Sequence, residues 1–324
     1  MATRSPNLIK PQRLVPGDNV GIIAPASAPP DPKAVDRAMN QVECLGFRPV
    51  LGRSVRMRHG FLAGSDRDRA GDVMRMFMDR RVRGIICLRG GYGAARLVER
   101  LDFSAIRMHP KVFAGYSDIT TLHCAFLTRA GLVTFHSPML NEGLGRADFP
   151  ACSNESFLHT VTISAPSGSL LKRCKPREKV TIVRRGVAEG RLLGGNLSVL
   201  MTTLHTPIQP RFRNRILFLE DVAEPPYRLD RMLTHLLNAG LLQQVAGVAF
   251  GTVTQCLDPL AKRAREYRQT ALDVIRERLA PLGIPVLAGL PFGHQPINAT
   301  IPTGIRARLD ANRGDLEIME SAVR

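Results

Sequence analysis

A serine stands where an expected strand ends and an expected helix begins. The segment 111–120, KVFAGYSDIT, opens with an apolar run and passes Gly115 and Ser117 before a helical pattern starts at Ile119. Such a turn lifts the serine oxygen out of the sheet and leaves the first backbone N–H groups of the helix unpaired beside it. Ser117 could therefore be a nucleophile with an oxyanion hole. It could also be a helix cap, the role that this segment taken alone favours.

Two further residues have side chains that would complete a catalytic group. Glu220 follows an apolar run at 216–219, and His294 follows another at 286–290, so each stands just past an expected strand. Taken singly, a glutamate or a histidine is more often solvated or structural. Together with Ser117 they supply a nucleophile, a base and a group that orients the base, in the order Ser, Glu, His.

A glycine-rich loop, RGGYG at 89–93, lies between an expected strand and a helix that starts near Ala94. It lacks the GxGxxG spacing and has no P-loop lysine, so nucleotide binding is weakly supported. Glycines would also let backbone N–H groups approach a reacting oxygen closely. A tight turn between strand and helix explains the same residues, and the sequence leaves both explanations open.

These residues need a scaffold, and the first half of the chain predicts one. Short apolar strands alternate with amphipathic helices that start near Asp31 and Ser65, a pattern typical of a parallel sheet with helices on both faces. The expected strands are 20–24, 48–51, 84–88, 112–114 and 133–135. Since loops at the carboxyl ends of such strands form the site, we expect three loops to share one rim, 25–30, 89–93 and 115–118.

The second half begins after a stretch rich in Pro, Gly, Ser and basic residues at 164–179. It is expected to hold strands at 180–183, 216–219, 247–253 and 286–290, helices starting near 197 and at 229–238 and 270–279, and a closing hairpin of 305–309 and 316–319. We predict an α/β protein with domains at 1–165 and 180–324, joined by a basic linker at 166–179.

The net charge of +17 could indicate nucleic acid, a membrane surface or an acidic substrate. The chain has no Trp, few aromatic residues and no recognisable nucleic-acid motif, and its basic residues are dispersed. A generally basic, solvated surface is the favoured explanation, without nucleic acid or membrane as a partner. No apolar stretch has the length of a signal peptide or a membrane span, so we expect a cytoplasmic protein.

The six cysteines and eight histidines show no metal-binding or CxxC spacing. Most of the cysteines lie within apolar segments. We therefore expect buried free thiols, and neither a metal nor a cofactor.

The chain resembles the L,D-carboxypeptidases, serine peptidases that include muramoyltetrapeptide carboxypeptidase and the microcin C immunity peptidases. The resemblance spans nearly the whole chain, because its motifs lie in both halves and in family order. They are GYSDITTLH around Ser117, RGGYGAARLV from Arg89, GGNL from Gly194, LEDVAEPPYRLDRMLTHL from Leu219 and PFGHQPINATIPTG from Pro291.

The resemblance implies a catalytic triad of Ser117, Glu220 and His294, and an oxyanion hole made by the backbone N–H groups of Gly91 and Asp118. It also implies a Rossmann-like N-terminal α/β sandwich and a C-terminal domain with a β-barrel-like core and flanking helices. The active site would lie in the groove between them, and the protein would be a homodimer. The Asp118 side chain is then expected to cap the helix that begins there.

Within this family the expected substrate is a cytoplasmic murein tetrapeptide, whose terminal D-alanine would be released from the preceding diamino acid. A free carboxylate calls for a basic partner, and Arg89 is the candidate, with Gly90 and Tyr92 beside it in the substrate site. One alternative is a microcin-type peptidyl-nucleotide hydrolase, which the absence of Trp disfavours because that branch stacks aromatic residues on the base. Another is a catalytically idle relative that binds peptides.

Overall fold

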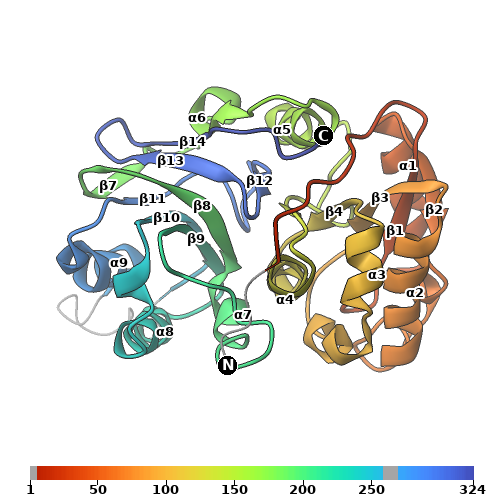
Figure 1. The fold of residues 1–324 in the computed structure, drawn as a ribbon, viewed down its shortest axis with the longest axis horizontal. Coiled ribbons are helices and arrows are strands. Elements are labelled where there is room, and N and C mark those ends of the chain that lie inside the picture. Colours follow the sequence, from red (N-terminus) through yellow and green to blue (C-terminus); the bar gives the residue numbers. More distant parts are fainter. Residues whose placement is uncertain (1–5, 258–268) are drawn as a thin grey trace.

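The computed structural model describes residues 6–257 and 269–324, and these form two β-sheets with helices packed around them (Figure 1). The first sheet has six strands in the order β12-β5-β4-β3-β1-β2. Its strands are β1 (Asn19–Ile23), β2 (Arg48–Leu51), β3 (Val82–Cys87), β4 (Val112–Gly115), β5 (Phe135–His136) and β12 (Ile301–Pro302). Strands β1 to β5 pair in parallel, which confirms the parallel sheet predicted for the first half.

Apolar side chains on both faces of this sheet explain why helices cover both sides. In β3, Ile86 points into the cluster that holds α1, whereas Ile85 and Cys87 point into the cluster that holds α2 and α3. A strand buried on both faces is expected to be apolar throughout, as these strands are. The helices are α1 (Ala34–Cys44), α2 (Asp66–Met78), α3 (Phe103–Met108) and α4 (Thr120–Ala125).

The second sheet is mixed and has eight strands, in the order β6-β14-β13-β8-β9-β10-β11-β7. They are β6 (Gly168–Ser169), β7 (Thr181–Arg184), β8 (Val187–Asn196), β9 (Arg215–Val222), β10 (Gly247–Thr254), β11 (Val286–Ala288), β13 (Arg306–Asp310) and β14 (Asp315–Ile318). β8 to β11 run parallel, and β13 and β14 form the predicted hairpin. Where a barrel-like core was expected, the structure has a mixed sheet, with β6 and β7 at its two edges.

The remaining helices pack around the second sheet and along the junction of the two sheets (Figure 1). They are α5 (Ala151–Thr162), α6 (Leu170–Arg173), α7 (Leu197–Met201), α8 (Pro226–Asn238) and α9 (Ala271–Leu279). Short helical turns link the elements at η1 (Ser54–Arg56), η2 (Ala94–Arg100), η3 (Ser117–Ile119), η4 (Phe126–Ala130), η5 (Leu242–Gln244) and η7 (Ala280–Leu282). The segment 166–179, predicted as a linker, contains β6 and α6, and β6 pairs with β14.

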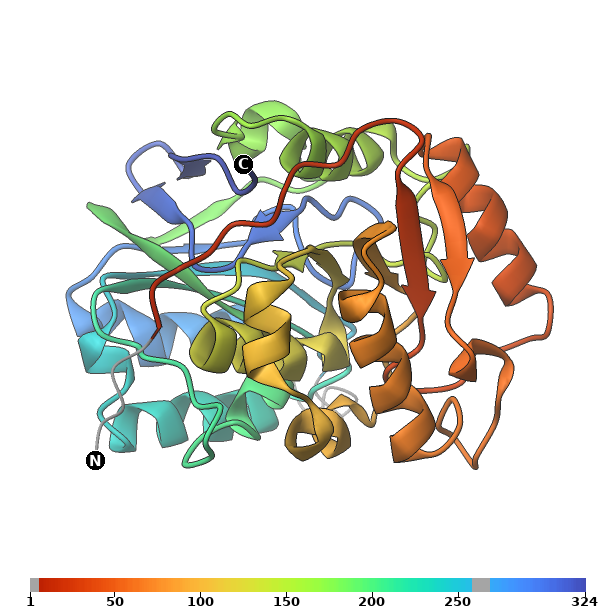
Figure 2. The same ribbon diagram turned by 45° about the vertical axis from the view of Figure 1, so that its right-hand side comes forward.

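The two halves of the chain are joined by more than a linker. β12, from the second half, pairs antiparallel with β5 and so completes the first sheet. The N-terminal segment runs across both halves before it enters β1 (Figure 2). There the Val133 N–H donates to the Ile9 carbonyl, and the Arg13 N–H donates to the Arg324 carbonyl. Regions that are distant in the sequence therefore share one hydrogen-bonded framework.

β8 is the longest strand of the second sheet, and its sequence did not predict it. Its glycines weaken the strand pattern, yet Gly194 has a structural reason. A Cβ added at Gly194 would lie 1.7 Å from the Phe218 carbonyl oxygen, so only glycine lets β8 approach β9 this closely. Asn196, the last residue of β8, then lies beside Glu220 of β9.

A buried arginine braces two of the loops at the carboxyl edge of the first sheet. Arg69 lies on α2, which begins at the Ser65 capping box. Its side chain is fully buried and donates to the carbonyl groups of Pro25 and Gly93. It also pairs with Asp66, which binds the exposed Arg96 as well.

We expect Arg69→Met to lower the free energy of unfolding by about 3 kcal/mol or more, because it leaves the Pro25 carbonyl without a donor and removes the buried partner of Asp66. Arg96→Met is the matched control, since it removes a partner of the same carboxylate from the surface, and should cost less than about 1 kcal/mol. Urea unfolding of both variants measures the difference. Equal losses would contradict the bracing role.

Candidate active site

Three loops meet at the carboxyl ends of β1, β3 and β4, as predicted from the strand ends. The Ser27 N–H donates to the Gly90 carbonyl at 3.2 Å, and the Tyr92 N–H donates to Ser27 Oγ at 3.1 Å. Gly90 lies against the third loop, because a Cβ added there would be 3.2 Å from Ser117 Oγ. The shared rim is therefore confirmed, and Ser117 lies on it.

Ser117 occupies a left-handed backbone conformation, with a φ of 63°. It is the first residue of η3, between β4 and α4, and neither helical segment has a capping hydrogen bond from a side chain. The helix-cap interpretation of Ser117 therefore has no supporting hydrogen bond. A non-glycine residue in this conformation costs roughly 1–2 kcal/mol, and strained strand-to-helix turns of this kind expose the side-chain oxygen of hydrolase nucleophiles.

His294, which is partly buried, and Glu220 form a short pair. Glu220 Oε2 lies 2.6 Å from His294 Nδ1 and also accepts the His294 backbone N–H at 3.2 Å. Glu220 is fully buried and lies within β9, because this strand continues to Val222 instead of ending at the predicted Leu219. Its other oxygen, Oε1, has no partner among the described residues.

The electrostatics of this pair favour a charged imidazole. Burial alone would lower the pKa of His294, but the hydrogen bond to Glu220 and the charge of that carboxylate outweigh burial. The net effect is a pKa above the ordinary value for histidine. A neutral His294 would carry its proton on Nδ1, facing Glu220, which leaves Nε2 free to accept another proton.

A cluster of five rings brings the serine and histidine segments together. The Tyr116 ring lies 4.7 Å from the His294 ring and 5.6 Å from the His136 ring, measured between centroids. His136 in turn packs against Phe218 and Phe292, each two residues before a predicted triad member. Edge-to-face contacts of this kind are favourable. The cluster therefore connects β4, β5, β9 and the loop after β11.

The Asp118 side chain has a different role from the one predicted. Its carboxylate accepts the Ala94 N–H at 2.8 Å and so caps η2, whereas the expectation that it caps the helix beginning at its own position is wrong. The reason is that the turn directs this carboxylate toward the neighbouring loop, where η2 presents an unpaired N–H. Burial raises the pKa of Asp118 to about 6, against the lowering effect of its backbone donors and Arg69.

The backbone N–H groups of Gly91 and Asp118, predicted as the oxyanion hole, both lie at this junction. A Cβ added at Gly90 would be 3.4 Å from the Asp118 nitrogen, and Gly91 has a φ of 100°, a conformation that glycine adopts without strain. Neither N–H donates to a loop, turn or cap acceptor within the described part of the chain.

A polar network, which the sequence did not predict, links the helix that follows Ser117 to two strands of the second sheet. The Asn196 N–H donates to Thr120 Oγ1 at 3.0 Å, and its side-chain amide donates to Asp221 at 3.1 Å. Asp221 also accepts the Ser198 N–H. Burial raises the pKa of Asp221 to about 6, and the adjacent Glu220 acts in the same direction. The network joins α4, which follows Ser117, to the ends of β8 and β9.

The predicted substrate residues lie along the rim, with one addition. Arg89 is half-buried and donates to the Ala28 carbonyl at 2.9 Å, while Tyr92 is exposed and packs 5.6 Å from the exposed Phe61 ring. Glu142 is the addition. It follows Asn141, whose N–H donates to the Leu88 carbonyl, so it lies beside Arg89. Neighbouring protein removes enough water to raise the pKa of Glu142 to about 7, although solvent still reaches it.

No periodic pattern in residues 137–150 marked Glu142 in the sequence.

Within residues 6–257 and 269–324, no group of three or more His, Cys, Asp or Glu side chains could hold a metal ion. The six cysteines are free, and Cys87, Cys124, Cys174 and Cys256 are buried, whereas Cys44 is exposed. No described helix is both long enough and apolar enough to cross a membrane.

Comparison with known proteins agrees with this architecture. Family models of the LD-carboxypeptidase N-terminal and C-terminal domains match residues 20–137 and 189–309. The chain is 39% identical to a probable murein peptide carboxypeptidase of Bacillus subtilis, over 93% of this chain and 91% of that protein. It is 32% identical to the murein tetrapeptide carboxypeptidase of Pseudomonas aeruginosa, over 91% and 94% of the two chains.

A solved structure of MccF in complex with glutamyl sulfamoyl guanosine has the same fold, with a TM-score of 0.83, 25% identity and coverage of 97% of this chain and 99% of that one. The two sheets and the two matched domains define a peptidase of the serine type. The chain belongs to the LD-carboxypeptidase family.

We expect the imidazole of His294 to titrate above the ordinary histidine pKa, and Glu220→Gln to move it below that value. The variant removes the attractive carboxylate but keeps the burial that disfavours the charged ring. NMR titration of the ring, assigned with His294→Gln, measures both values. Glu99→Gln removes an exposed carboxylate of the same charge and should leave the titration unchanged. An unaltered pKa in Glu220→Gln would contradict the pairing.

Proposed function

We propose that the chain is a murein peptide carboxypeptidase that releases the terminal D-alanine of a tetrapeptide, with Ser117 as nucleophile, His294 as base and Glu220 as the group that orients the base. The observation that carries this proposal is the pair of the buried Glu220 with His294, 2.6 Å between Oε2 and Nδ1, beside the strained turn of Ser117. The names of the Bacillus and Pseudomonas relatives support the substrate.

The first chemical step is acylation of the serine. Glu220 holds Nδ1, so Nε2 of His294 takes the Ser117 proton while Oγ attacks the carbonyl carbon of the amide. The amide C–N bond breaks as His294 returns the proton to the departing amine of D-alanine. A water molecule, deprotonated by His294, then attacks the acyl carbon. The bond between that carbon and Ser117 Oγ breaks, His294 returns the proton to Oγ, and the shortened peptide leaves.

The tetrahedral intermediates carry a negative oxygen that needs preorganised donors. We assign this role to the backbone N–H groups of Gly91 and Asp118, because both lie at the loop junction next to Ser117 and neither is used by another loop or cap among the described residues. One such donor contributes about 2.7–4 kcal/mol to the barrier in well-studied hydrolases. The Asp118 carboxylate keeps the junction in place by capping η2.

Arg89 is the candidate for binding the terminal carboxylate of the substrate, with Gly90 and Tyr92 beside it. Its guanidinium group is anchored to the Ala28 carbonyl and keeps further N–H donors for a ligand. Charge-assisted hydrogen bonds to a carboxylate are stronger than neutral ones. A substrate with a blocked carboxyl end would therefore bind more weakly.

A second function is favoured by one observation, the exposed Phe61 and Tyr92 rings next to the glycine-rich loop. Such a pair could stack on a nucleobase, and the relative MccF was solved with a guanosine conjugate. A peptidyl-nucleotide hydrolase is thus the alternative, and an idle peptide-binding relative is the third candidate. On the primary proposal, the protein acts on wall-derived peptides in the cytoplasm as a homodimer, with domains at 1–165 and 180–324.

We expect Ser117→Ala to release D-alanine from a murein tetrapeptide at least about 1,000-fold more slowly, because the nucleophile is gone. Ser104→Ala, on the exposed face of α3, is the matched control and should keep full activity. Mass spectrometry of released D-alanine gives the rate, and thermal melting shows that both variants fold. Hydrolysis of an aminoacyl-nucleotide conjugate without D-alanine release would favour the alternative, and tight binding without turnover of either would favour the idle relative.

We expect Arg89→Gln to raise KM for the tetrapeptide by about tenfold or more with a smaller change in kcat, because a charge-assisted contact contributes roughly 1.5–3 kcal/mol. A tetrapeptide with an amidated carboxyl end is the control. The variant and the parent protein should bind it equally weakly. An unchanged KM for the tetrapeptide with a free carboxyl end would contradict the role of Arg89 in binding the carboxylate.

A further inference from the structure

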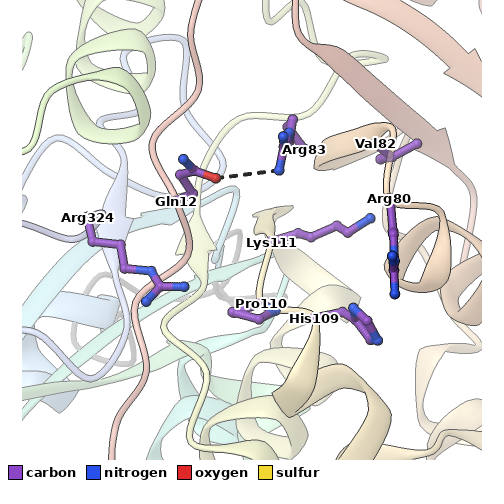
Figure 3. Close-up of a pocket in the computed structure, with 8 residues that line it drawn as sticks. All are labelled: Gln12, Arg80, Val82, Arg83, His109, Pro110, Lys111 and Arg324. Atoms are coloured by element: carbon purple, nitrogen blue, oxygen red, sulfur yellow. Dashed lines mark hydrogen bonds between the residues drawn. The ribbon is translucent and has the colours of Figure 1, made fainter.

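A concave site lies at the opposite end of the first sheet from Ser117. It has a volume of about 400 Å³ and opens at the amino ends of β3 and β4 (Figure 3). Its walls come from the N-terminal segment, the turn between α2 and β3, the turn between α3 and β4, and the last residue of the chain. The lining residues are Gln12, Arg80, Val82, Arg83, His109, Pro110, Lys111 and Arg324.

The pocket is lined by basic side chains without an acidic one. Arg80, Arg83 and Arg324 make no ion pair within the part of the chain that the structure describes. Their only side-chain hydrogen bond there is the one from Arg83 to Gln12, at 3.5 Å (Figure 3). Each guanidinium group carries five N–H donors and no acceptor. The pocket therefore gathers positive charge and unused donors in one place.

Asp79 is the carboxylate nearest in sequence to the arginines of the pocket, and it pairs mainly with a residue outside the pocket. Asp79 precedes the turn, but Arg81 binds both of its oxygens, at 3.0 Å and 2.8 Å. These bonds hold the pKa of Asp79 to about 2. Arg81 is largely exposed and does not line the pocket. The negative charge at this turn is therefore already paired outside the pocket.

Lys111 is fixed at the wall of the pocket rather than free in solvent. Only 7% of the residue is exposed, and its Nζ donates to the carbonyl groups of Met76, in α2, and Asp79, just after it. An ammonium group has three donors, so one remains for a ligand. Burial lowers the pKa of Lys111 to about 8, and a bound anion would restore the charged form.

We propose that this pocket binds a small molecule that carries a chain of two or more phosphoryl groups. Planar guanidinium forks and a lysine ammonium match the geometry of phosphate oxygens. The volume accommodates more than one phosphoryl group. Val82 and Pro110 are the apolar residues of the lining, and the lining holds no Phe, Tyr or Trp to stack on a base, so the phosphate chain itself is the recognised part.

Calorimetric titration of the whole protein with inorganic triphosphate at low ionic strength tests this site. We expect measurable binding that Arg83→Glu weakens by at least about tenfold, because the variant replaces donors with a repelling charge. Arg67→Glu is the matched control. It makes the same change of net charge on an exposed position of α2 outside the pocket, and should weaken binding by less than about threefold. Unchanged melting temperatures show that both variants fold.

The possible outcomes separate this site from general attraction to a basic protein. Absence of binding, or equal weakening by both variants, overturns the proposal. Citrate binding as tight as that of triphosphate overturns the assignment to phosphate chains. Tighter binding of a single-stranded oligonucleotide, lost in Arg83→Glu, assigns the pocket to nucleic acid instead. None of these measurements uses the peptide substrate, so the result is independent of the proposed peptidase activity.

Discussion

The packing of His136 against rings from both sheets is the contact on which the geometry of the site depends. His136 is fully buried, and neither ring nitrogen has a hydrogen-bond partner among the described residues. Burial holds its pKa well below the ordinary value, so the ring packs as a neutral aromatic group. It contacts Tyr116, Phe218 and Phe292, which adjoin the segments of the three triad candidates. The relative position of serine and histidine thus rests on apolar packing between sheets.

Local patterns in the sequence predicted much of this architecture. Apolar runs located most of the strands, and the capping residues Ser65 and Thr270 located the starts of α2 and α9. Strand ends also nominated Ser117, Glu220 and His294 as site residues. Local patterns could not predict that Glu220 and His294 form a hydrogen bond, because the two residues are 74 positions apart in the sequence.

The elements that the sequence did not reveal have physical reasons in common. β8 carries glycines because β9 approaches it closely, and β12 is two residues long and pairs with a strand from the other half of the chain. The Asp118 carboxylate caps a helix 24 residues away rather than its own. In each case a contact with a distant segment decided the conformation, and short-range propensity carried no information about that contact.

The pairing of β12 with β5 also bears on how this chain is made. During synthesis, β5 has an unpaired edge until residues 301–302 emerge, although every other strand of the first sheet is complete by residue 136. Contacts of such sequence separation form late and slow folding, and an open edge invites pairing with other chains. Until residues 301–302 are translated, the first sheet therefore has an open edge at β5, and something other than β12 must keep that edge from pairing with other chains.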